Sequence, residues 1–129
     1  MQIPKNAVNW VEIPVKDFER AKQFYNTIFQ FDMPETNMGM NRMGFLLFDM
    51  QQGGVGAAIV QGADYISSQR GCLVYLNAGN DLSEVLDRIP NAGGKIELGK
   101  SPVSESQHLG YFAIFYDTEG NRLALHSME

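Results

Sequence analysis

Two segments of the chain share one pattern: a strand with alternating apolar and polar residues, an aspartate, and an amphipathic helix. In the first copy the strand covers Val11–Val15 and the aspartate is Asp17. In the second copy the strand covers Leu73–Gly79 and the aspartate is Asp81. Alternation with a period of two is typical of a strand that buries one face. The repeat therefore predicts two similar modules that can close around one cavity.

Both predicted helices carry start signals and a single apolar face. Asp17 is placed to accept a hydrogen bond from a free backbone N–H at the start of the first helix. Asp81, with Glu84 three residues later, has the spacing of a capping box, and Gly93 and Gly94 are expected to end the second helix. Apolar residues spaced by three and four predict buried helix faces. They are Phe18, Ala21, Phe24, Tyr25, Ile28 and Phe29 in the first helix and Leu82, Val85, Leu86 and Ile89 in the second.

The remaining segments give each half the order strand–helix–strand–strand–strand. We expect the further strands at residues 30–34, 42–49 and 55–60, then at 72–76, 95–98, 111–116 and 122–127. The polar segments 62–70 and 99–108 are predicted to be loops, and 117–121 is a turn that joins a hairpin. The sequence therefore predicts an α+β fold in a single domain, residues 1–129. Two paired βαβββ modules, of about residues 1–65 and 66–129, form a curved mixed sheet around a cup.

Composition and charge narrow the classes of function. The 44% apolar and 19% charged content is typical of a soluble globular protein, and we find no apolar run long enough to cross a bilayer. The N-terminus lacks the features of a signal peptide, and the single cysteine, Cys72, has no internal partner for a disulfide. These features favour the cytoplasm. A net charge of −5 with scattered basic residues disfavours nucleic acid as a partner.

Two long motifs resemble a known family. The segment EIPVKDFERAKQFYNTIFQF resembles the opening of the vicinal oxygen chelate superfamily, and GYFAIFYDTEGNRLALHS resembles its closing hairpin. This superfamily includes glyoxalase I, bleomycin resistance proteins and extradiol dioxygenases, and the resemblance covers essentially the whole chain. It implies paired βαβββ modules around a cup-shaped sheet, and it makes a homodimer plausible. It does not identify one activity, because the superfamily hosts many chemistries.

The resemblance also implies where a metal would be bound. In the family's enzymes a divalent metal is held in the cup by histidine, glutamate or glutamine side chains. The first ligand position lies seven residues before Asp17 and is Trp10, and the last lies four residues after Gly120 and is Ala124. Neither side chain is a metal ligand. A third position, near residues 72–74, offers only Cys72. We therefore expect no metal site and no cofactor.

Glu12 and His126 are the candidate catalytic residues. Each lies two positions beyond an expected ligand position, so strand alternation places each on the same face as that position. The two side chains are interpreted in three ways: a structural hydrogen bond, a ligand-contacting or proton-transfer pair in which Glu12 orients His126, or ligands of a displaced metal site. His108, in the loop predicted to cover the cup, either contacts a ligand or is solvated. Cys72 is expected to be buried.

The candidate ligand-binding residues are Trp10, Tyr75, Phe112 and His108. Trp10 offers a face for stacking at an expected metal position. The strand residues that can line the hollow of the cup are Phe45, Leu47, Tyr75, Phe112 and Ile114. Alternation alone does not tell which of them point into it. The preferred hypothesis is a protein that binds a small molecule in a cup without a metal. The alternatives are a lyase, isomerase or dioxygenase with a site around Glu12 and His126, and a dimeric interaction module with a filled cup.

Overall fold

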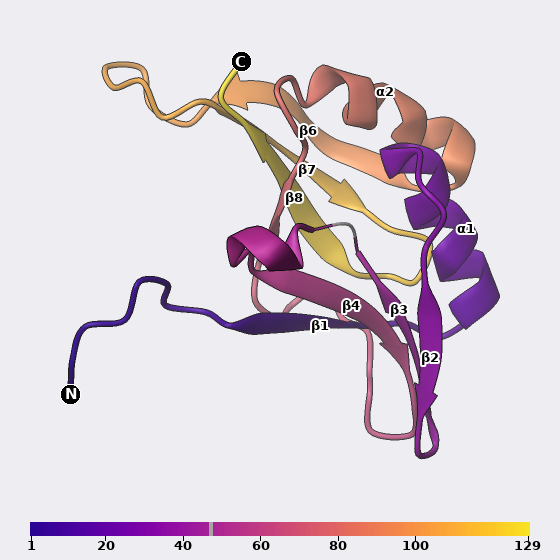
Figure 1. Cartoon of the computed structure of the whole chain (residues 1–129). Helices are drawn as coiled ribbons and strands as arrows, with labels where there is room; N and C mark the ends of the chain where they lie inside the picture. Colours follow the sequence, from indigo (N-terminus) through magenta and orange to yellow (C-terminus); the bar gives the residue numbers. More distant parts are fainter. Residues whose placement is uncertain (47) are drawn as a thin grey trace.

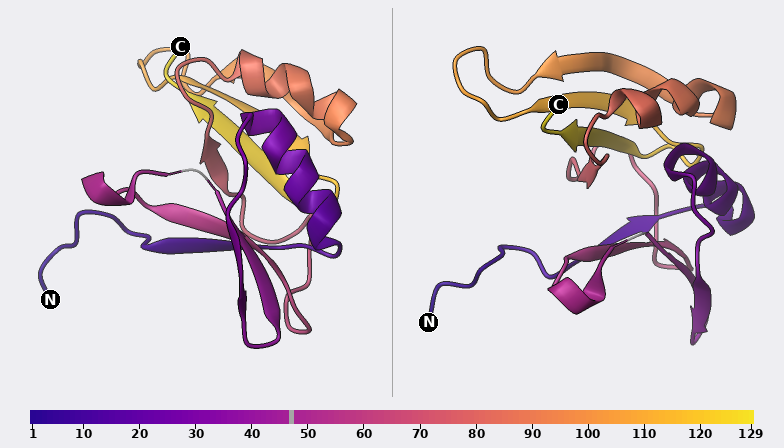
Figure 2. Two further views of the ribbon diagram at one scale, coloured as in Figure 1. Left: turned by 45° about the vertical axis from the view of Figure 1, so that its right-hand side comes forward. Right: turned by 45° about the horizontal axis from the view of Figure 1, so that its top comes forward.

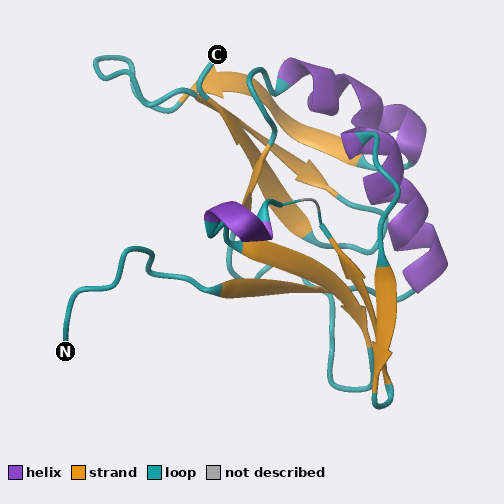
Figure 3. Ribbon diagram, viewed as in Figure 1, coloured by secondary structure: helices purple, strands orange, loops and turns teal. Residues whose placement is uncertain are grey.

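The computed structural model describes residues 1–46 and 48–129, so the predicted lining residue Leu47 lies outside the described residues. The described residues form two four-stranded sheets, two α-helices and one short 3-10 helix, arranged as Figures 1 and 3 show. The first half contains β1 (Trp10–Pro14), α1 (Phe18–Phe29), β2 (Glu35–Met38), β3 (Asn41–Phe45), η1 (Met50–Gln52) and β4 (Gly56–Gln61). The second half contains β5 (Tyr75–Asn77), α2 (Ser83–Ala92), β6 (Lys95–Pro102), β7 (Tyr111–Tyr116) and β8 (Arg122–Ser127).

The two halves repeat one topology, which confirms the predicted α+β fold of paired βαβββ modules. The first sheet has the order β1-β4-β3-β2 and the second has the order β5-β8-β7-β6. The pairs β1–β4 and β5–β8 are parallel, whereas the other pairs are antiparallel. The predicted hairpin of residues 111–116 and 122–127 has the bounds of β7 and β8.

The second strand does not lie where the sequence pattern placed it. It was predicted at residues 30–34 but begins at Glu35. The reason lies at the end of α1, where the Phe31 amide donates to the Asn26 carbonyl and the Met33 amide donates to Oδ1 of Asn26. These bonds hold residues 31–33 against the helix. Other bounds also shift: β3 ends at Phe45, β5 begins only at Tyr75, and β6 extends into the predicted loop as far as Pro102.

The predicted cap of α1 by Asp17 is confirmed, but Asp81 at the start of α2 makes a different contact from the predicted one. Oδ1 of Asp17 accepts a hydrogen bond from the Arg20 amide at 3.1 Å. Asp81 does not form the expected capping box with Glu84. Its carboxylate accepts from the Ser83 amide at 2.9 Å, in a tight turn before α2. Gly93, with φ of 105°, ends α2 as predicted.

The core lies between the helices and one face of each sheet. The helices pack against each other on one side of the sheets (Figure 2), and both predicted apolar helix faces are buried, except that Phe29 is only half-buried. Strand residues of both modules belong to the same cluster as the helix residues, among them Ile13, Ile59, Leu76, Ala113, Phe115, Leu123 and Leu125. The two modules therefore share one core. In the described part of the chain, no helix is both long and apolar enough to cross a membrane.

A polar contact also joins the modules at the turn between β7 and β8. The side chain of Glu119 is fully buried and accepts hydrogen bonds from the backbone amides of Lys16 (2.9 Å) and Asp17 (2.7 Å). Arg20 donates to the same carboxylate through Nε at 2.7 Å. Beside it, Nδ2 of Asn121 donates to the Pro14 carbonyl at 2.7 Å. The turn thus holds the end of β1 next to β8, and we name this set of contacts the Glu119 clasp.

Candidate functional site

Strand alternation divides each sheet into a core face and an open face. In β1, Ile13 belongs to the core cluster, whereas Trp10 and Glu12 point to the opposite side. In β8, Leu123 and Leu125 belong to the core, so the alternate residues point away from it. We call the two sides opposite the helices the open faces. The predicted site residues Trp10, Glu12, Tyr75, Phe112 and His126 all lie on them.

The open face of the first sheet carries three aromatic rings. The ring of Trp10 lies 6.0 Å from that of Phe45 and 5.8 Å from that of Phe48, centroid to centroid. Trp10 remains 37% exposed. Gly56 lies opposite Trp10 in the register, and a Cβ at Gly56 would come within 2.3 Å of the Phe48 ring. A glycine at this position therefore allows Phe48 to lie over the strand and contact Trp10.

The second sheet carries a smaller aromatic pair on its open face. The rings of Tyr75 and Phe112 lie 6.3 Å apart. Tyr75 is 53% exposed and is opposite Ala124 in the register. Ala124 is buried, and the predicted lining residue Ile114 is buried beside it. The exposed aromatic surface of this sheet therefore lies around Tyr75.

Glu12 is held by a residue that the sequence did not suggest. The hydroxyl of Tyr65 donates to Oε1 of Glu12 at 2.6 Å. This hydrogen bond, together with partial burial, raises the pKa of the Tyr65 phenol, which keeps it a proton donor at neutral pH. Tyr65 lies in the segment predicted as a polar loop. Its aromatic side chain within that segment was the feature of the sequence that could have identified it as a site residue. The bond ties this loop to β1.

His126 has a different partner from Glu12. Its Nε2 lies 2.8 Å from the carbonyl oxygen of Leu109, so the ring is joined to the loop between β6 and β7. Within residues 1–46 and 48–129 no hydrogen bond joins His126 to Glu12. The predicted role of these two residues as a pair stays a prediction. His108 is exposed in the same loop as Leu109.

A small pocket lies where the two modules meet. It has a volume of about 170 Å³, and Glu12 from β1 and Arg122 from β8 both line it. Cys72 also lines it and is exposed, so the prediction of a buried cysteine was wrong. The reason is that β5 begins only at Tyr75, which leaves Cys72 on the connecting loop. The remaining lining residues are Ile13, Pro14, Ile66, Ser68, Gly71, Val74, Asn121 and Leu123.

The charge of Arg122 is engaged within the second sheet. Its Nη2 and Nε donate to the carboxylate of Glu97 at 2.8 and 3.1 Å. The Arg122 guanidinium, and then the Tyr116 hydroxyl, lower the pKa of Glu97 to about 2. Glu97 is therefore ionised at neutral pH and offsets the positive charge of Arg122.

The residues at the expected metal positions do not fit a metal ion. An indole at Trp10 and a methyl group at Ala124 provide no lone pair for a divalent cation. In the described ranges there is no group of three or more histidine, cysteine, aspartate or glutamate residues that could hold a metal. Cys72, near the third expected position, lies on the loop beside the small pocket. The exposed indole of Trp10 instead favours contacts with apolar and aromatic groups, whereas Ala124 is buried.

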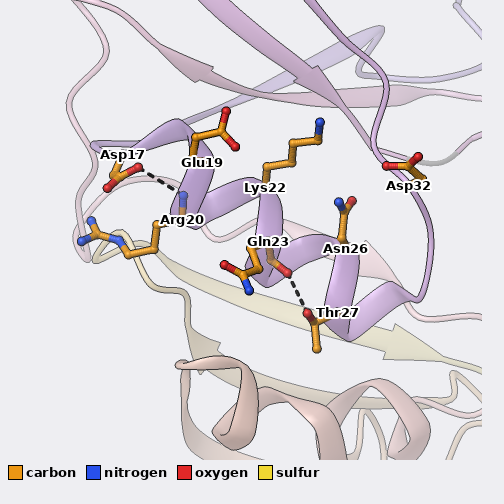
Figure 4. Close-up of a pocket in the computed structure, with 8 residues that line it drawn as sticks. All are labelled: Asp17, Glu19, Arg20, Lys22, Gln23, Asn26, Thr27 and Asp32. Atoms are coloured by element: carbon orange, nitrogen blue, oxygen red, sulfur yellow. Dashed lines mark hydrogen bonds between the residues drawn. The ribbon is translucent and has the colours of Figure 1, made fainter.

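A larger hollow of about 660 Å³ lies elsewhere, along the exposed side of α1 (Figure 4). Charged and amide side chains line it, and none of the predicted site residues belongs to it. Three of its charges already have partners: Lys22 binds Glu35 at 2.9 Å, Arg20 binds Glu119, and Glu19 binds Arg42. This hollow has no aromatic lining. We therefore place the candidate site on the open faces.

Solved structures share this fold at low sequence identity. A hypothetical protein from S. aureus has a TM-score of 0.65 at 18% identity, over 96% of this chain and 99% of the other. The fosfomycin resistance protein FosX from Listeria monocytogenes has a TM-score of 0.63 at 19% identity, over 95% and 90% of the two chains. A glyoxalase I mutant from Zea mays has a TM-score of 0.70 at 16% identity. There the match covers 92% of this chain but only 44% of the maize chain. At such identities the likeness shows the fold alone.

The family is shown by the sequence itself. None of the curated proteins matches the chain. A family model, however, matches residues 7–125, which is nearly the whole chain. This match confirms the resemblance that the opening and closing motifs indicated. The chain belongs to the Glyoxalase/Bleomycin resistance protein/Dioxygenase superfamily.

Proposed function

We propose that this protein binds a small molecule with a flat, apolar ring on its open faces without a metal ion. The observation that carries the proposal is the aromatic cluster around Trp10, which stands at a position where the family resemblance implies a metal ligand. An indole offers a large stacking surface and a single N–H donor. The position is therefore suited to contact with a ring system.

The exposure of the rings supports binding rather than packing alone. Trp10 and Tyr75 keep 37% and 53% of their surface exposed, although both have aromatic neighbours. Apolar surface costs free energy in water, at roughly 25 cal/mol per Å². A flat ligand that covers one of these rings recovers that free energy. The neighbouring rings hold Trp10 in place before binding, which reduces the entropy lost in the complex.

A second copy of the chain is the competing occupant of the same surface. The open faces carry exposed apolar side chains besides the aromatic rings, such as Leu98 and, in the adjoining loop, Leu109. A homodimer would cover them. Analytical ultracentrifugation with and without ligand separates the two cases, because a filled dimer interface would exclude the ligand.

The test uses the single tryptophan of the chain as a reporter. Trp10 fluorescence is followed while 2-naphthol, a neutral flat probe, is added in the presence of a chelator such as EDTA. We expect saturable quenching and a matching rise in melting temperature, because a ligand that binds the folded state stabilises it by mass action. Loss of binding after chelation, restored by a transition metal, would contradict the proposal.

Variants locate the binding surface. Tyr75→Ala keeps the Trp10 reporter and should weaken binding of the probe if the probe spans both open faces. Trp10→Ala removes the reporter, so its binding is measured by calorimetry, and it should lose most of the binding. Met40→Ala is the matched control, because Met40 is a fully exposed apolar residue at the turn between β2 and β3. Equal binding by the Trp10→Ala and Met40→Ala variants would place the ligand elsewhere.

A further inference from the structure

We infer that the ligand of the open faces carries a cationic amine, which binds Glu12 while the attached ring lies against Trp10. The inference rests on the proposed function and adds a chemical class to it. It depends on three observations: the position of Glu12 beside the aromatic cluster, the absence of a cation that neutralises it among the described residues, and the pocket at its side.

Glu12 lies between an aromatic surface and a pocket. On the open face of β1 the successive side chains are those of Trp10, Glu12 and Pro14, and a strand rises about 3.3 Å per residue. Neighbours on one face are therefore about 7 Å apart along the strand. This distance suits a molecule in which two or three bonds separate a ring from an amine. The carboxylate of Glu12 is exposed, so it is accessible to a ligand.

Among the described residues, no cation forms an ion pair with the carboxylate of Glu12. Its described partner is the neutral Tyr65 hydroxyl on Oε1, and a carboxylate has about four acceptor positions. None of the ion pairs within residues 1–46 and 48–129 involves Glu12. The cation that lines the adjacent pocket, Arg122, is bound to Glu97. The site therefore attracts a positive charge and disfavours a negative one.

The surroundings of Glu12 also suit an organic cation. The 170 Å³ pocket beside it has apolar walls that include Pro14, Ile66 and Leu123. Such walls can contact the methylene groups next to an amine. A hydrated metal ion offers no such apolar surface. Trp10 adds a further attraction, because tryptophan is the side chain that binds cations best through its ring face.

The experiment compares three probes that share one ring and differ in charge. Phenethylamine is the cation, 2-phenylethanol is the neutral analogue, and 3-phenylpropionate is the anion. Quenching of Trp10 fluorescence at low salt should show phenethylamine binding about fivefold tighter than the alcohol, the upper range for an exposed ion pair. Added salt should reduce this preference, since screening weakens exposed ion pairs. The carboxylate should bind weakest.

Glu12→Gln should remove the preference for the amine over the alcohol. Glu84→Gln, which deletes the same charge on the exposed side of α2, should retain it. Equal binding of amine and alcohol by the natural protein overturns the inference, and so does a preference that survives Glu12→Gln. If 2-naphthol binds in these cases, the proposed function stands. If none of the aromatic probes binds, the proposed function fails as well.

Discussion

Removing the carboxylate of Glu119 should destabilise the whole domain strongly. This side chain is fully buried at the contact between the modules. Burial alone would raise the pKa of Glu119, but hydrogen bonds from Arg20, from the Asp17 amide and from Thr118 outweigh it and hold that pKa below its ordinary value. The carboxylate is therefore ionised at neutral pH and stabilises the N-terminus of α1. We choose Glu119→Ala as the perturbation.

The size of the effect follows from what the substitution leaves without a partner. The backbone amides of Lys16 and Asp17 lose an acceptor whose side chain is fully buried. An unsatisfied buried N–H costs about 1–3 kcal/mol, so two of them cost about 2–6 kcal/mol. Arg20 is half-exposed and can turn towards solvent, so the loss of its bond to Glu119 adds little to the cost. We therefore expect a loss of about 3–5 kcal/mol, out of a total stability of about 5–15 kcal/mol.

The assay is equilibrium unfolding in urea, followed both by circular dichroism and by Trp10 fluorescence. The midpoint should fall while the slope of the transition stays the same, because the surface exposed on unfolding is unchanged. Glu105→Ala is the control, since Glu105 is an exposed loop residue and should change stability by no more than about 0.5 kcal/mol. A loss below about 1 kcal/mol for Glu119→Ala would refute the reasoning. It would mean that water reaches the amides of Lys16 and Asp17.

Three further predictions follow from individual contacts. Tyr25→Phe should lower stability by about 1–2 kcal/mol in the same urea assay, because the buried Tyr25 hydroxyl donates to Oδ2 of Asp117 at 2.7 Å. The ion pair of Glu97 and Arg122, in which the pKa of Glu97 is lowered from 4.5 to about 2, should stabilise the protein fully above pH 4.5 and lose its effect as the pH falls to about 2. The difference in urea midpoint between the natural protein and Glu97→Gln should shrink over that interval, and a constant difference would contradict the pKa. Gly56→Ala should displace Phe48 from Trp10, shift the Trp10 emission to longer wavelength and weaken probe binding.

The sequence predicted those parts of the fold that depend on local patterns. The hairpin of β7 and β8 was placed correctly because alternation and a turn rich in Asp, Gly and Asn coincide there. The strand β2 was misplaced because residues after α1 donate hydrogen bonds to Asn26. These bonds are a property of the helix end, and apolar content does not report them.

The sequence predicted which candidate site residues share a strand face, but not which residues form hydrogen bonds with them. Alternation placed Glu12 with Trp10 and His126 with Ala124. It could not show that Glu12 binds Tyr65, 53 residues away, or that His126 binds the Leu109 carbonyl. Such contacts depend on the path of loops across the sheets, and loop paths have no period in the sequence. The exposure of Cys72 has the same cause, since it follows from where β5 begins.

The Glu119 clasp and the proposed site are coupled through β1. The clasp fixes the end of this strand next to β8, and the pocket that Glu12 and Arg122 line exists only while these strands stay together. A ligand that contacts both strands binds this arrangement and not the separated one. At a hundred times its dissociation constant it adds about 2.7 kcal/mol to the stability of the arrangement. This amount is comparable to the expected loss in Glu119→Ala, so a saturating ligand of this kind should restore most of the stability of that variant. A ligand bound only to the second sheet does not favour the joined arrangement over the separated one. If the modules separate before they unfold, such a ligand would therefore not restore the stability of Glu119→Ala.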